Sequence, residues 1–232
     1  MNKRFLRNQI LFFDKDLSKL ANLKVIIFGV GGVGGQVVEM LARSGIENLT
    51  LVDFDRVNIT NINRQIIALE STIDKLKVEV FKDRILDINP NAKVTIFPIV
   101  YDENHLINLN DYDYIIDAID QVSSKILLIK EAYKAKVKII SAMGAGNKLN
   151  PLAFKVAKIN QTSVCPLAKI IRNELKKYGI SDLKVVYSQE NSIKTNYVEN
   201  NKKVIGSWAS VTSTMGNIIA NEVLKDLIEK YC

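Results

Sequence analysis

Short apolar runs alternate along the chain with stretches in which apolar residues recur at helical spacing. The runs predict strands at residues 24–29, 48–53, 93–100, 113–118 and 137–141. Between them the spacing predicts helices around Val37, Met40 and Leu41, at residues 74–88, where Asn89-Pro90 ends the helix, and at residues 122–135. This βαβ alternation favours an α/β, Rossmann-like fold, a mostly parallel sheet with helices on both of its faces.

The pattern changes after residue 142. Residues 154–159 and 184–188 predict strands around a helix near residues 166–178, which indicates an antiparallel C-terminal extension of the sheet. Residues 191–203 are polar and without periodicity, which is typical of a mobile loop. The chain closes with an amphipathic helix on which apolar residues recur every four positions, namely Met215, Ile219, Val223 and Leu227.

The N-terminal segment, residues 1–22, predicts a helical lead-in with Phe5, Ile10, Phe13 and Leu17 available for packing. No linker cuts the chain into separate units. We therefore predict a single domain, with a nucleotide-binding core at residues 1–142 and a substrate-side extension at residues 143–232.

A glycine-rich turn joins the first predicted strand to the first core helix, and its glycines are Gly29, Gly31, Gly32 and Gly34. Glycines let the backbone approach an anion closely, and the N–H groups at the start of the following helix attract phosphate. Asp53 ends the second strand, about 20 residues on, where a Rossmann-type acid would bind the ribose hydroxyls. The motif predicts a nucleotide site without saying which nucleotide binds.

Further polar side chains follow the strand ends, where the ligands of parallel sheets bind. They are Asp55, Asn61, Arg64, Gln65, Lys77 and Asp120. Taken singly, Asn61 is a common turn residue, Arg64 and Lys77 could be surface charges, and Asp120 could cap the helix at residues 122–135. Together they offer cations for phosphates and, in Asp120, a carboxylate that suits Mg²⁺ held jointly with phosphate oxygens.

Composition narrows the classes of protein further. The formal net charge of +7 favours an anionic partner. The two cysteines, Cys165 and Cys232, cannot build a four-cysteine zinc site, and without a histidine near Cys165 we do not predict a cysteine nucleophile. No apolar run approaches the roughly 20 residues that span a bilayer, and no signal-peptide core follows Met1, so we expect a cytoplasmic protein without membrane contact.

The glycine loop, residues 53–65, Lys77 and the run Asp117-Ala-Ile-Asp120 together resemble the adenylating core of the ThiF/MoeB/HesA superfamily, relatives of ubiquitin-activating enzymes. The resemblance spans residues 4–142 and implies ATP rather than NAD. By position it implies Asp53 on the ribose, Asn61, Arg64 and Lys77 on the phosphates, and Asp120 on Mg²⁺, with Asp55 and Gln65 among the nucleotide-binding residues. Arg7 resembles an arginine that many members send across a homodimer to the partner's ATP.

The second half resembles the tRNA threonylcarbamoyladenosine dehydratase branch of that superfamily through residues 140–151, 165–172, 185–191 and 206–208. This implies ATP-dependent cyclisation of threonylcarbamoyladenosine in tRNA, with Arg7, Arg64, Lys77 and Asp120 as the catalytic residues. Two alternatives stay open, adenylation of a ubiquitin-like sulfur carrier and an NAD-dependent oxidoreductase. The absence of the paired zinc cysteines weighs against the first, and the absence of cysteine from residues 189–207 puts a sulfur-relay partner in doubt.

The sequence also predicts two interaction surfaces. Lys169, Arg172 and Lys176 recur at helical spacing, which is typical of a solvated helix face and, beside a tRNA-modifying resemblance, predicts a surface for the phosphate backbone. Arg7 and an N-terminal segment rich in apolar residues that we expect to be exposed, Phe5, Phe12 and Phe13, predict a homodimer.

Overall fold

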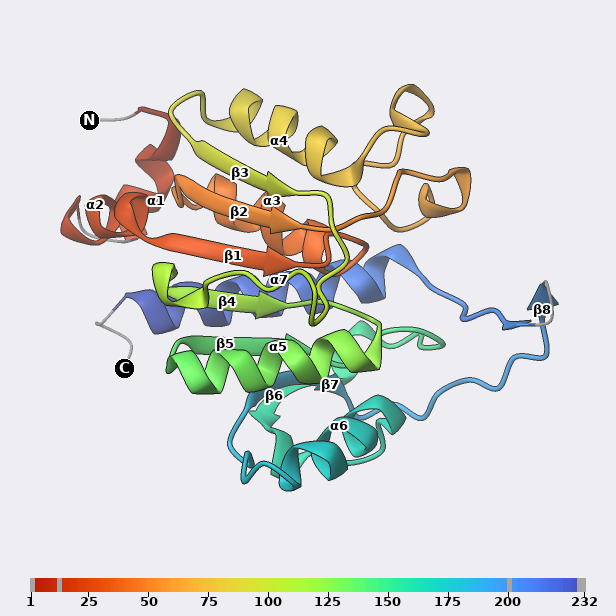
Figure 1. Ribbon diagram of the computed structural model, residues 1–232. Helices are drawn as coiled ribbons and strands as arrows, with labels where there is room; N and C mark the ends of the chain where they lie inside the picture. The colour runs from red at the N-terminus through yellow and green to blue at the C-terminus, as the bar shows by residue number, and fades with distance from the viewer. Residues whose placement is uncertain (1–2, 12–13, 200–201, 229–232) are drawn as a thin grey trace.

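A seven-stranded sheet forms the centre of the protein in a computed structural model that describes residues 3–11, 14–199 and 202–228 (Figure 1). Its strands are β1 (Lys24–Phe28), β2 (Asn48–Val52), β3 (Lys93–Phe97), β4 (Tyr114–Asp117), β5 (Lys138–Ala142), β6 (Phe154–Lys158) and β7 (Lys184–Ser188). Their spatial order is β3-β2-β1-β4-β5-β7-β6, and neighbours are parallel except for the antiparallel pair β6–β7. The predicted α/β architecture and the antiparallel extension are thereby confirmed.

Helices cover both faces of the sheet. One face packs against α3 (Gly34–Arg43), α4 (Lys77–Ile88) and α7 (Ala209–Leu227), and the other against α5 (Val122–Ala135) and α6 (Pro166–Lys176). Two short helices, α1 (Leu6–Leu11) and α2 (Asp14–Asn22), precede β1. Short 3₁₀ turns occur at Lys3–Phe5, Ile59–Asn61, Glu70–Thr72, Leu109–Asp111, Pro151–Ala153 and Ile159–Gln161.

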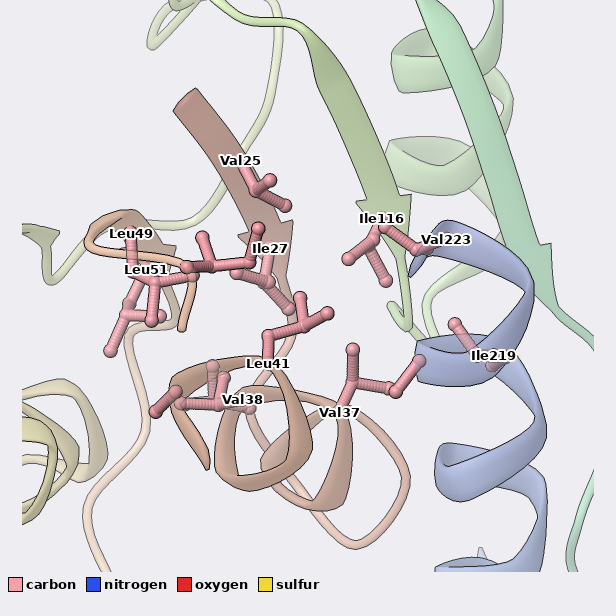
Figure 2. Close-up of a cluster of buried hydrophobic side chains, with 14 of the residues drawn as sticks. Val25, Ile27, Val37, Val38, Leu41, Leu49, Leu51, Ile116, Ile219 and Val223 are labelled. Carbon is pink, nitrogen blue, oxygen red and sulfur yellow. The ribbon is translucent and has the colours of Figure 1, made fainter. Parts of the chain in front are cut away.

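The central strands are unbroken apolar runs because both of their faces are buried in the core. Val25 and Ile27 of β1 point to the layer with α3 and α7, as Figure 2 shows, whereas Ile26 and Phe28 pack in the layer with α5. A strand that is buried on both faces cannot alternate with polar residues. The predicted stripe on α7 is confirmed, because Met215, Ile219, Val223 and Leu227 are all buried in the first layer.

The strand order reverses between β1 and β4, and this opens a crevice at their carboxyl ends. The chain leaves β1 toward β2 on one side, while β4 continues the sheet on the other. Gly29 makes the sharp exit from β1 with φ of +81°, and a Cβ there would lie 2.6 Å from the carbonyl oxygen of Ala118. Only glycine fits this crossing. Ligands of open parallel sheets bind at such a switch point.

Most predicted strands are shorter in the structure by one to three residues, and two other predicted elements differ more substantially. The helix predicted at residues 74–88 begins only at Lys77, because the backbone of Val57 pairs with that of Asp74 and Lys75, and Asp74 adopts φ of +66°. The predicted loop at residues 191–203 contains a small antiparallel pair, β8 (Val198–Glu199) with β9 (Lys202–Lys203). It lies at the end of an arm that extends beyond the carboxyl edge of the sheet (Figure 1).

The N-terminal segment is helical as predicted, but Phe5 is buried rather than exposed. The apolar residues that α1 exposes are Leu6, Ile10 and Leu11. Phe12, Phe13 and Cys232 lie outside the described residues. Among the helices that the structure describes, none has the length and apolarity needed to cross a membrane.

Candidate active site

A cavity of about 620 Å³ lies at the carboxyl ends of β1, β2, β4 and β5. One half of its wall consists of the glycine loop and the segments after β2 and β4, including Gly31, Gly32, Asp53, Asp55, Asn61, Arg64, Gln65, Lys77 and Asp120. The other half comes from residue 142 onward, including residues 142–148, 165–167, 192, 205 and 207. The residues predicted from the core motifs all line this cavity except Gly34, which is buried at the start of α3.

Asp53 holds the glycine loop in place. Its Oδ2 accepts a hydrogen bond of 2.8 Å from the backbone N–H of Val30, and its Oδ1 accepts one of 2.9 Å from the N–H of Asp55. Burial raises the pKa of the Asp53 carboxyl above its ordinary value, against the opposing charge of Lys77. Asp53 therefore joins the two loops that frame the cavity, a role beyond the ribose contact that the sequence predicts.

The predicted phosphate-binding side chains are positioned by the turn after β2. Asn61 Oδ1 accepts from the N–H of Asn58 at 3.1 Å, so Asn61 is a turn residue and a cavity residue at once. Arg64 Nη1 donates to the carbonyl oxygen of Thr60 at 2.8 Å, and burial lowers the pKa of the Arg64 guanidinium. Gln65 Oε1 is buried without a hydrogen-bond partner among the described residues, which leaves an acceptor in the cavity wall.

Lys77 is the first residue of α4, and its side chain lines the cavity and forms an ion pair with Asp55. Its Nζ lies 2.7 Å from Asp55 Oδ2, and the Lys77 side chain is only 5% exposed, whereas that of Asp55 is 47% exposed. Burial of a lysine without a partner is unfavourable, and Asp55 supplies the compensating charge. A pairing between residues so far apart in sequence carries no local signal, so sequence reasoning did not find it.

Asp120 follows β4 and lines the cavity as an exposed side chain. It makes no hydrogen bond or ion pair within the part of the chain that the structure describes, and the cap position of α5 belongs to Gln121. The helix-cap interpretation is therefore wrong, and the carboxylate is available to a ligand.

A buried charge network lies directly behind this segment. Lys125 Nζ donates to Asp117 Oδ2 at 2.8 Å, to Ser141 Oγ at 3.2 Å and to the carbonyl oxygen of Ala142 at 3.0 Å. Lys125 and Asp117 are fully buried. The network ties the end of β4 to the end of β5, and so holds the segments that carry Asp120 and Met143 in a common geometry. Sequence reasoning missed Lys125, which reads as one of many lysines on an amphipathic helix.

Asn147 anchors the arm, residues 191–207, to the second half of the cavity. Its N–H donates to the carbonyl oxygen of Gly206 at 2.8 Å, and its Oδ1 accepts from the N–H of Gly206 at 2.7 Å. Its carbonyl oxygen accepts from the N–H of Ile193 at 2.8 Å. Both ends of the arm are thereby held against the cavity, which they line through Ser192, Ile205 and Ser207.

Two sets of predicted residues lie outside the cavity. Arg7 is on α1, which lies at the edge of the sheet opposite the cavity (Figure 1). This helix contacts the end of α3 through the bond from Asn8 Nδ2 to the carbonyl oxygen of Arg43. On α6, Lys169 and Lys176 are exposed. Arg172 is half-buried, and its Nη1 donates to the carbonyl oxygen and hydroxyl of Thr162 at 2.8 and 2.6 Å, so this arginine stabilises the loop before α6.

Comparison with known proteins places this geometry in a family. The sequence profile of the ThiF family matches residues 5–231. The tRNA threonylcarbamoyladenosine dehydratase of Bacillus subtilis is 39% identical over 99% of this chain and 96% of its own length. Crystal structures of the Escherichia coli tRNA N6-threonylcarbamoyladenosine dehydratase, TcdA, are 32% identical and cover 98% of this chain and 94% of that one. The TM-score is 0.88 for the complex with AMP and 0.87 for the complex with ATP.

Similarity to adenylyltransferases covers a smaller part of this chain. The molybdopterin-synthase adenylyltransferase of Escherichia coli is 34% identical, but over only 53% of this chain and 49% of its own length.

Proposed function

The chain belongs to the ThiF family, and from this premise we propose that it is an ATP-dependent tRNA threonylcarbamoyladenosine dehydratase. The observation that carries the proposal is the extent of the similarity. Dehydratases match nearly the whole chain, including the residues after 142 that form the second half of the cavity, whereas the adenylyltransferase matches about half of it. Because both halves line one cavity and share one sheet, we propose that they act as a single domain.

The charge and the backbone of the first half of the cavity suit ATP. The glycine loop leaves the backbone open to the phosphates, and Arg64 and Lys77 supply cations beside it. We assign the ribose to Asp53 and the phosphates to Asn61, Arg64 and Lys77, with Asp55 and Gln65 in the surrounding wall. The support is the convergence of these side chains on one cavity, together with the ATP and AMP complexes of the Escherichia coli enzyme.

Asp120 fits a role in holding Mg²⁺. The described residues contain no group of three or more acidic, histidine or cysteine side chains that could hold a metal alone. Mg²⁺ in nucleotide sites is held by one or two carboxylates together with phosphate oxygens, and Asp120 offers one unpaired carboxylate in the cavity. There the ion would neutralise charge on the triphosphate.

The reaction that suits the cavity begins with carboxylate activation. An oxygen of the threonylcarbamoyl carboxylate attacks the α-phosphorus of ATP, and the bond to pyrophosphate breaks. A nitrogen or oxygen of the same modification then attacks the activated carbonyl carbon, AMP leaves, and the attacking group loses its proton. The modified base has lost one water overall. Arg64 and Lys77 stabilise the negative charge that moves onto the phosphates, and no protein nucleophile takes part.

We also propose a homodimer in which Arg7 acts on the partner's cavity. Arg7 is remote from the cavity of its own chain, and the same helix exposes Leu6, Ile10 and Leu11. A role in tRNA modification also favours a cytoplasmic location. It further favours the basic residues of α6 as a surface that binds the tRNA backbone. Nothing in the chain favours a sulfur-relay partner, since residues 189–207 contain no cysteine.

The decisive experiment is nucleoside mass spectrometry of tRNA that is shown beforehand to contain threonylcarbamoyladenosine. With the protein, ATP and Mg²⁺, we expect this nucleoside to lose the mass of one water and AMP to accumulate with pyrophosphate. Unchanged nucleoside would refute the proposed function. Formation of ADP and phosphate instead would retain the dehydratase and replace the adenylate by an acyl phosphate.

A further inference from the structure

Lys148 is a buried cation in the half of the cavity that the nucleotide-binding motif does not account for. The residue is only 3% exposed, yet it lines the cavity. Its Nζ donates to the carbonyl oxygen of Glu190 at 2.6 Å. An ammonium group has three donors, so this bond leaves two of them for a ligand.

The surroundings of Lys148 do not neutralise it fully. Glu190 is the nearby acid, but its carboxylate accepts the N–H groups of Leu149 at 3.0 Å and of Asn150 at 2.9 Å. Those backbone bonds, with the charge of Lys148, lower the pKa of Glu190. Glu190 does not line the cavity, and Lys148 is the only charged residue among the described residues from 142 onward that do.

A second source of positive potential faces the same space. Helix α6 begins at Pro166, which lines the cavity with Leu167, and the cap residue Cys165 makes no side-chain hydrogen bond to the first turn. The first N–H groups of a helix have no partner within the helix, and they carry partial positive charge. This end of α6 therefore adds to the field of Lys148 without neutralising it.

We infer that Lys148 binds the carboxylate of the threonylcarbamoyl group and directs it toward the α-phosphate of ATP. The inference rests on the proposed function. Arg64 and Lys77 lie beside the glycine loop and are assigned to the triphosphate, so a substrate anion needs a cation of its own to approach it. Lys148 meets this need from the half of the cavity wall that residues after 142 contribute, as a specificity-determining residue that recognises the free carboxylate.

The same contact serves both chemical steps. In the first, one carboxylate oxygen stays on Lys148 while the other forms the bond to phosphorus and pyrophosphate leaves. In the second, negative charge develops on the carbonyl oxygen as the ring closes and before AMP departs. A buried ammonium beside that oxygen stabilises the developing charge more strongly than a solvated one would.

The test compares binding of two forms of the substrate tRNA, one with the free threonylcarbamoyl carboxylate and one with that group as its methyl ester. Binding is measured with a non-hydrolysable ATP analogue present. We expect the wild-type protein to bind the acid at least about tenfold more tightly, the usual scale for a hydrogen bond to a charged group. Equal binding of the two forms by the wild-type protein would overturn the inference, whether or not any variant folds.

Variants then separate the charge of Lys148 from its structural bond. K148Q keeps a donor for the Glu190 carbonyl oxygen but removes the charge, and we expect it to bind acid and ester equally, with unchanged affinity for the ATP analogue. K148R keeps the charge and is expected to retain the preference for the acid. A K148Q protein that still prefers the acid by the wild-type ratio would refute the assignment.

Lys138 provides the matched control. Its Nζ also donates to a backbone carbonyl oxygen, that of Asp226 at 3.3 Å, but it begins β5 at the edge of the sheet opposite the cavity. K138Q should keep the full preference for the acid. If the wild-type protein dehydrates threonylcarbamoyladenosine but binds the ester equally well, only the inference fails. If it does not dehydrate that nucleoside, the proposed function fails.

Discussion

Single side chains in the cavity differ in whether they already have partners. Asp53, Asn61 and Arg64 each bond to the backbone of the surrounding loops, so their removal changes both the loops and any ligand contact. Asp120 has no such bond within the described chain. A substitution of Asp120 should therefore affect ligand binding without changing the loops around the cavity.

We expect D120A to abolish dehydration while leaving the fold intact, because the substitution removes a cavity carboxylate and no core packing. Turnover should fall by more than about tenfold, a loss above about 1.4 kcal/mol of transition-state stabilisation. The measurement is the rate of nucleoside conversion, with the thermal unfolding midpoint recorded alongside.

D83A is the appropriate control, since Asp83 is an exposed carboxylate on α4 outside the cavity. It should retain wild-type turnover. Activity of D120A within about tenfold of wild type would mean that the metal, if required, is held by other groups.

At the scale of elements, the sequence predicts helices and strands well wherever burial determines the pattern. The central strands are apolar because they are covered on both faces, and the stripe on α7 matches its buried side. The start of α4 could not be predicted, because the backbone of Asp74 and Lys75 pairs with Val57 across an intervening turn. Such a pairing depends on tertiary position rather than on local spacing.

The same distinction applies to the active site. The glycine loop and the residues after β2 are contiguous in sequence, so their type and spacing predict one half of the cavity. Lys148 and Lys125 depend on partners that other elements supply, Glu190 and Asp117. A lysine on its own is most often a surface residue, and nothing in the local sequence marks these two as buried.

Helices α3 and α4 are linked by a charged contact whose strength should depend on pH. Glu39 is 3% exposed and accepts from Arg84 at 2.6 and 3.0 Å and from Arg43 at 2.7 Å. Burial acts to raise the pKa of Glu39, but the bonds to Arg84 and Arg43 outweigh it, so the pKa lies below its ordinary value of 4.5. The stabilisation is therefore present above about pH 4.5 and is lost as the pH falls through the lower, folded-state pKa.

We expect E39Q to lower the free energy of unfolding by about 1–3 kcal/mol at neutral pH, because the bidentate charged bonds to Arg84 are lost. The difference from wild type should shrink as the pH falls below about 4.5. Urea unfolding at several pH values measures it, with E70Q on an exposed turn as the control. A difference that stays constant down to pH 3 would contradict the argument.

Helix α6 should contribute to tRNA affinity through Lys169 and Lys176, both exposed. In K169E/K176E we expect weaker tRNA binding, a shallower dependence of affinity on salt and unchanged ATP binding, since phosphate contacts act through released counter-ions.

The pair K82E/K93E changes the net charge equally at another surface and serves as the control. Equal losses in both double variants would indicate a general charge effect, while R172E should mainly destabilise the loop at Thr162.

The whole molecule is expected to act as a dimer through α1. Ile10 and Leu11 are 69% and 71% exposed on a short helix, which is a large apolar surface to leave in water. We expect I10D to sediment as a monomer at micromolar concentration and to lose activity, because Arg7 would no longer reach a partner's cavity. Purified wild-type protein that sediments only as a monomer would refute the proposed dimer.

L152D supplies the control for that experiment. Leu152 is 86% exposed on another surface, so a charge there should alter neither the sedimentation of the protein nor its activity. If both variants dissociate the dimer, the interface lies over a wider surface than α1.

The ion pair between Lys77 and Asp55 has a consequence for selectivity. Because Asp55 Oδ2 lies 2.7 Å from Lys77 Nζ, an entering anion must exchange places with a carboxylate instead of meeting a bare cation. A small monovalent anion gains nothing from that exchange, whereas a triphosphate brings several charges and further contacts. The half-exposed Asp55 can turn to solvent at little cost when it is displaced. We therefore expect the Lys77 position to discriminate against chloride and other small monovalent anions.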